Sequence, residues 1–220
     1  MGAVNFLKFD LRRSKYLFLI SIVLFAPLGA MMGYTMESTL GIFSYMALVV
    51  VVTPTSLFTY ELKNECGFDG LLPAKDRDKV FGRYMIGALS ILFELVLGIV
   101  ICTVMSRFTD LKVVDLGVVS MTFVAVTLTY LSIAMVVYYL IGRNLNPRIR
   151  SSIIMLPCII LWFGANTIIS VLSEIHAMGL VSKVIENKEI VSALAMMIGL
   201  AMYVISALIS VQIVKKKDYR

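Results

Sequence analysis

Long apolar runs separated by short polar segments dominate the chain. Six runs reach the ~20 residues that a helix needs to cross ~30 Å of hydrocarbon. The predicted spans lie at about 16–36, 40–60, 84–106, 116–142, 153–173 and 190–214. An open sheet would leave backbone groups without partners in lipid, and barrel strands alternate in polarity, so strands are excluded as the main architecture. The pattern predicts an all-α integral membrane protein, with residues 1–220 forming one transmembrane domain of six helices.

Composition supports a membrane protein and charge predicts its orientation. The chain is 60% hydrophobic and 15% charged, with a mean hydropathy of +0.92. The net charge of +6 would suggest a nucleic-acid partner in a soluble protein. Here 16 of the 20 lysines and arginines lie before span 1, between spans 2 and 3, between spans 4 and 5, and after span 6. The positive-inside rule therefore predicts a plasma-membrane protein with both termini in the cytoplasm. Because topology explains the positive charge, we expect no nucleic-acid partner.

The same rule assigns individual residues to the two sides of the membrane. We expect Lys75 and Arg148 to face the cytoplasm and Lys183 to face outward. Residues 174–189 form the longest outer segment, and apolar residues at helical spacing predict a short helix there. Residues 4–15 mix basic and apolar side chains, which fits either a short helix along the cytoplasmic headgroups or a simple basic flank of span 1.

The polar segment 61–83 between spans 2 and 3 is a candidate docking element. Its centre places Phe68, Leu71 and Leu72 between glycines and a proline, where a merely solvated linker has little use for them. Such residues fit docking on another protein, and they equally fit a charged loop with apolar anchors that tuck against the membrane. The candidate contact residues are Glu65, Phe68, Asp69, Leu71, Leu72, Pro73 and Arg77.

Glu94 is the only charged residue well inside a predicted span. Gly87, Ser90, Glu94 and Gly98 fall on one stripe of a helix, and small residues on a stripe let another helix approach closely. A charge that faced lipid there would cost ~2.5–3.5 kcal/mol or more, so we expect Glu94 to face protein or a water-filled path. Glu94, Ser90 and, in span 5, Asn166 are thus candidates either for a translocation path or for helix packing.

Motifs for covalent or nucleotide chemistry are missing from the sequence. The nearest match to a phosphate-binding loop, Gly82 to Gly87, is followed by Ala88 where a lysine is required. One histidine, His176, makes a metal site improbable. The three cysteines form no disulfide framework. We therefore expect no enzyme activity and no metal or other cofactor in this chain.

The segment after span 2 carries a family resemblance. It reads Leu72-Pro73-Ala74-Lys75-Asp76-Arg77, then Lys79-Val80-Phe81-Gly82-Arg83-Tyr84 at the entry to span 3. With the six-span layout, this stretch resembles the membrane subunit of a type-2 ABC exporter. The chain is most similar to the small Gram-positive permeases that export peptides such as phenol-soluble modulins or bacteriocins.

The resemblance implies partners that the sequence does not contain. A separate ATPase subunit would bind ATP and Mg²⁺ and dock on a coupling helix within 61–83, and a second permease copy would complete a homo- or heterodimer. The implied activity is ATP-driven export of an amphipathic or hydrophobic substrate, such as a peptide, by alternating access. Two other classes stay open: a non-transporting immunity or sensor module, and a secondary transporter, although the latter would need paired intramembrane charges.

Overall fold

The computed structural model describes residues 3–50, 75–109, 115–141 and 187–218. Within these ranges the regular structure is helical: α1 (Ala3–Ile20), η1 (Ser21–Phe25), α2 (Ala26–Thr35), a helix at Thr39–Val50, α5 (Asp76–Phe108), α6 (Leu116–Ile141) and α9 (Lys188–Asp218). Four helices in the described part are long and apolar enough to cross a membrane. The all-helical membrane architecture predicted from the apolar pattern is confirmed for these residues.

The helices can be compared with the predicted spans. α6 begins at Leu116, the first residue of the predicted span 116–142. α9 begins at Lys188, two residues before the predicted span 190–214. Span 3, expected from residue 84, instead begins as a helix at Asp76. The additional turns are helical because they pack: Val80 is buried at 1% exposure and Arg83 at 3%. Predicted span 153–173 lies outside the described residues.

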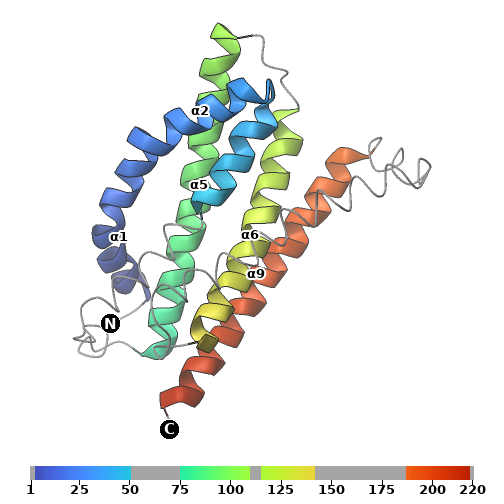
Figure 1. The fold of residues 1–220 in the computed structure, drawn as a ribbon. Helices are drawn as coiled ribbons and strands as arrows, with labels where there is room; N and C mark the ends of the chain where they lie inside the picture. The colour runs from blue at the N-terminus through green and yellow to red at the C-terminus, as the bar shows by residue number, and fades with distance from the viewer. Residues whose placement is uncertain (1–2, 51–74, 110–114, 142–186, 219–220) are drawn as a thin grey trace.

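The first span begins much earlier than predicted. α1, η1 and α2 form one 33-residue helix, Ala3–Thr35, so residues 4–15 are not a separate surface helix. Its axis changes direction between α1 and α2 (Figure 1). Pro27 explains the change, because proline lacks an N–H and its ring clashes with the carbonyl four residues earlier. The helix widens into a π-turn just before it, where the Ala26 N–H donates to the Ser21 carbonyl.

The helix at Thr39–Val50 folds back on α2 to form a tight hairpin. Glu37 in the turn has a φ of 48°, a backbone conformation that reverses the chain within a few residues. Gly29 and Gly33 face Met46 and Ile42 across the hairpin, and a side chain at either glycine would collide with them. The glycines therefore let the two helices approach closely.

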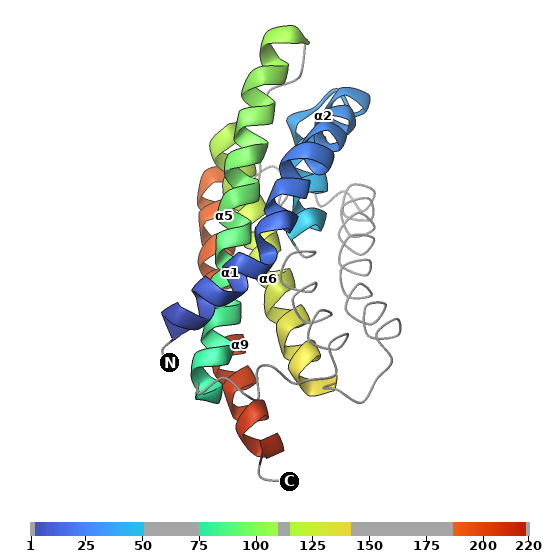
Figure 2. The same cartoon turned by 90° about the vertical axis from the view of Figure 1, so that its left-hand side faces the viewer.

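The helices form a bundle whose two termini lie at one end. Figures 1 and 2 place the N-terminus, the C-terminus, the start of α5 and the end of α6 together at that end. α6 and α9 pack against each other more extensively than any other pair of described elements, and α1 packs on α5. The core includes Ile42, Met46, Leu131 and Met135, each at 2% exposure or less.

Candidate functional site

The stripe of α5 predicted to face protein contacts three other elements: α9, η1 and the helix at Thr39–Val50. Gly87 accepts Tyr203 of α9, whose hydroxyl would lie 2.5 Å from a Cβ at that position. Gly98 similarly accepts the ring of Phe43. Ser90 is fully buried, and its hydroxyl donates to the Gly87 carbonyl at 2.8 Å. Small residues therefore let α5 contact both a helix that precedes it in the chain and a helix that follows it.

Glu94 lies on this stripe, at 1% exposure, opposite the π-turn of the first span. The Ser21 hydroxyl hydrogen-bonds to its carboxyl group. Its Oε2 atom has no hydrogen-bond partner among the described residues. Next to this contact, the ring of Phe18, three residues before Ser21, meets the ring of Phe93, the residue before Glu94. The two rings lie edge to face with centroids 5.0 Å apart. The acid is thus enclosed by protein, at the place where the backbone of the first span departs from α-helical geometry.

Two tyrosines hold α9 against the first turns of α5. The Tyr203 hydroxyl donates to the Tyr84 carbonyl at 2.6 Å, and the hydroxyls of Tyr84 and Ser210 lie 2.9 Å apart. The two tyrosine rings are tilted against each other with centroids 5.0 Å apart. Each buried hydroxyl therefore has a partner on the other helix, as buried tyrosines usually require.

A buried ion pair joins α1 to α5 near the end that carries the termini. Arg83 Nε donates to Asp10 Oδ2 at 2.8 Å, and the two side chains are 3% and 0% exposed. The guanidinium also lies over the Phe6 ring, 5.7 Å from its centroid. Gly82 makes room for that ring, because a Cβ there would be 2.8 Å from Phe6 Cδ1. The contact joins residues 73 positions apart, and Arg83 is the last residue of the polar segment 61–83.

Sequence reasoning missed this pair. Asp10 lies in a basic flank, and the sequence indicates Arg83 only as a positive charge of the segment 61–83 and as part of the stretch that carries the family resemblance. One signal was present: Asp10 is the only acidic residue before Glu37, and it lies four residues from both Phe6 and Ser14. These three are the buried residues of α1.

The predicted docking residues can be placed only in part. Six of them lie outside the described residues: Glu65, Phe68, Asp69, Leu71, Leu72 and Pro73. Asn166, a candidate for the translocation path or for helix packing, also lies outside them. Arg77 is exposed on the first turn of α5, with its guanidinium 5.4 Å from the centroid of the Phe81 ring. Arg77 is therefore available at the end of the bundle where 61–75 joins α5.

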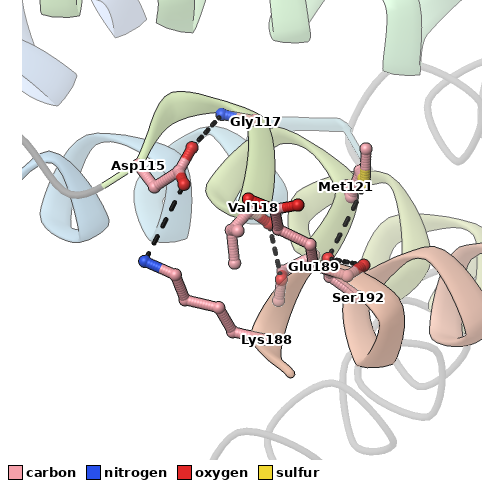
Figure 3. Close-up of polar contacts among 8 residues, drawn as sticks. Asp115, Gly117, Val118, Met121, Lys188, Glu189 and Ser192 are labelled. Atoms are coloured by element: carbon pink, nitrogen blue, oxygen red, sulfur yellow. Dashed lines mark hydrogen bonds and ion pairs between the residues drawn. The ribbon is translucent and has the colours of Figure 1, made fainter. Parts of the chain in front are cut away.

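The opposite end of the bundle carries weaker polar contacts, shown in Figure 3. Asp115 precedes α6 and accepts the Gly117 N–H at 3.1 Å, while its other oxygen lies 3.8 Å from Lys188 Nζ. Both side chains are substantially exposed, at 39% and 52%, so the ion pair is worth ~0–1 kcal/mol. Ser192 donates to the Met121 sulfur at 3.6 Å. These contacts join the ends of α6 and α9 and have no chemistry of their own.

Comparison with known proteins gives one match. The model of a family described as ABC-2 family transporter protein matches residues 6–215. The match extends from Phe6 in α1 to Lys215 in α9, so it covers all the contacts described above. No curated protein and no solved structure matches the chain.

Proposed function

The chain belongs to the ABC-2 family of transporter proteins, and on this premise we propose that it is the permease subunit of an ATP-driven exporter. The family match over residues 6–215 is the observation that carries the proposal. An ABC permease works with an ABC ATPase, and this chain has no phosphate-binding loop of its own. ATP and Mg²⁺ therefore belong to the partner, and this chain contributes positioning and not covalent chemistry.

In this proposal the ATPase acts on the segment 61–83. Its last residues, 76–83, form the first turns of α5, and Arg83 there is paired with Asp10 on α1. Movement imposed on the start of α5 would therefore reach the first span as well, because separating the two would break a buried ion pair. Two permease copies with two ATPases would alternate between inward and outward access.

The substrate in this proposal is amphipathic or hydrophobic, most simply a peptide. The support for this substrate is the resemblance of residues 72–84 and of the six-span layout to small Gram-positive peptide exporters. A secondary transporter is less well supported, because Glu94 is the only charged residue deep within a span among the described helices, whereas ion-coupled carriers usually pair such charges. An immunity or sensor module would bind a partner without moving a substrate.

The coupling role is tested by truncating the proposed anchors. Phe68→Ala combined with Leu72→Ala should release the ATPase on purification and uncouple hydrolysis from export. An anchor in a well-packed interface is worth ~2 kcal/mol, or about 30-fold in binding. Phe108→Ala is the matched control, because Phe108 is 81% exposed at the opposite end of α5. Normal co-purification of the double variant with a fully stimulated ATPase would remove 61–83 as the coupling element.

Orientation is tested by cysteine labelling in intact cells. In a chain whose three cysteines are replaced, Lys75→Cys and Arg148→Cys should resist a membrane-impermeant reagent, and Lys183→Cys should react with it. Labelling at position 75 would place the coupling segment on the wrong side for an ATPase.

A further inference from the structure

α1 has a buried face and an outward face that differ completely in charge. Phe6, Asp10 and Ser14, at successive four-residue steps, are the buried residues of the helix. Lys8, Arg12 and Lys15 are exposed, and their spacing of four and three residues places them on one side of the helix. We call these three the basic face of α1; it extends for about 10 Å along the axis.

The buried ion pair is the reason that this face carries only positive charge. Asp10 is the single acidic residue of α1, and it is turned inward to Arg83 with no exposed surface. A rotation of α1 that exposed Asp10 would separate the pair and also remove Phe6 from beneath the Arg83 guanidinium. The contact with α5 therefore fixes the rotation of α1 about its own axis. In this rotation its lysines and arginine face outward, and no carboxylate of α1 lies beside them.

Apolar side chains share the outward side with these cations. Val4, Leu11, Tyr16 and Leu19 are 56%, 40%, 65% and 58% exposed. The Lys15 ammonium lies over the Tyr16 ring, 4.8 Å from its centroid. Exposed apolar residues mixed with lysine and arginine are typical of a helix at the membrane interface, where side chains enter the acyl boundary and cations remain at the headgroups.

Continuity with the first span places the basic face beside lipid. α1 runs without interruption into η1, where Ile22 and Val23 are 53% and 67% exposed. Lys15 precedes Leu19 by one turn, about 6 Å along the axis, which is the depth of a headgroup layer. Figure 2 shows α1 crossing α5 obliquely, so α1 rises less steeply along the bundle than a helix parallel to α5 would.

We propose that the basic face of α1 binds the phosphate headgroups of anionic phospholipids. The charge complements an anionic headgroup, and the adjacent apolar residues complement its acyl chains. A soluble acidic protein would match the charge but would leave the exposed apolar residues of the same face without lipid. The proposal rests on the membrane setting and the geometry of α1, and it holds whether or not the chain is an exporter.

The test titrates the full-length chain in detergent with phosphatidylglycerol or phosphatidylcholine and counts bound lipid by native mass spectrometry. Each lysine or arginine near an anionic surface contributes about a fivefold gain in binding. Lys8→Gln with Arg12→Gln should therefore weaken phosphatidylglycerol binding by roughly 25-fold at low salt, and leave phosphatidylcholine binding unchanged. Lys8→Arg with Lys15→Arg should retain the preference.

The charge-matched control is Lys215→Gln with Lys216→Gln, two exposed lysines near the end of α9. Equal losses in the α1 and α9 variants would show diffuse surface charge and overturn the proposal. Equal affinity of the unmodified chain for both lipids would also overturn it. If the α1 variant releases the ATPase subunit but keeps its phosphatidylglycerol preference, the basic face binds a protein partner and the proposal is wrong.

Discussion

The α6–α9 and α1–α5 interfaces hold the same bundle together by different means. Between α6 and α9 the contact is long and depends on small residues: a Cβ on Gly199 would lie 3.0 Å from the Ala125 carbonyl oxygen. Between the first span and α5 the contact is polar at two levels, Asp10 with Arg83 and Ser21 with Glu94. The first interface depends on shape and the second on specific partners.

This difference separates a scaffold from a connection that can transmit movement. Two helices that pack closely through small residues lose contact energy over the whole interface when they separate. This favours movement of α6 and α9 as one body. The stability that a buried ion pair contributes depends strongly on both partners, because removing one leaves the other charge buried alone. The polar interface also includes Arg83, the last residue of the segment 61–83, and the π-turn η1. The three substitutions below test this contrast.

Loss of the ion pair should have the largest effect. Arg83→Leu leaves the Asp10 carboxylate buried without the guanidinium, at a cost of about 3–5 kcal/mol in the free energy of unfolding. The double variant Asp10→Leu with Arg83→Leu should recover much of that loss, because no charge then stays buried. Thermal stability of the purified chain in detergent measures both, with exposed Arg77→Leu as control. A double variant as unstable as the single one would show that the pairing is not what matters.

Crowding of the α6–α9 interface should have an intermediate effect. Gly199→Leu would force its side chain against the backbone of Ala125, which cannot rotate away, so the helices must separate. We expect a loss of about 1–3 kcal/mol. Ala201→Leu, two residues along on the exposed side of α9, should be silent in the same thermal assay. Equal stability of the two variants would contradict the small-residue packing described here.

Neutralising Glu94 should have the smallest effect on stability. Glu94→Gln preserves the size of the side chain and its ability to accept from Ser21, so we expect a change within about 0.5–1 kcal/mol. Export measured in the same variant distinguishes the two predicted roles. Reduced export at normal protein levels would assign Glu94 to the translocation path, and unchanged export would assign it to packing between α5 and the first span.

Local pattern predicted a large part of the fold. Runs of apolar residues identified the helices that became α5, α6 and α9, because lipid requires each span to satisfy its own backbone. The stripe of Gly87, Ser90, Glu94 and Gly98 correctly indicated a face of α5 turned toward protein, since glycine and a buried acid are both unfavourable toward lipid. The local pattern does not predict the start of α5 at Asp76, because the polar residues there favour a loop, whereas burial of Val80 and of Arg83, which pairs with Asp10 of α1, accompanies a helix.

By itself, the sequence determined that this is a helical membrane protein, since helix length and hydropathy depend only on neighbouring residues. It also determined which face of α5 is buried. Only the tertiary structure decided that Asp10 pairs with Arg83, that Tyr203 occupies the space over Gly87, and that Lys8, Arg12 and Lys15 turn outward together. These contacts join residues far apart in the chain, and the rotation of each helix about its axis is set by its partners and not by its own periodicity.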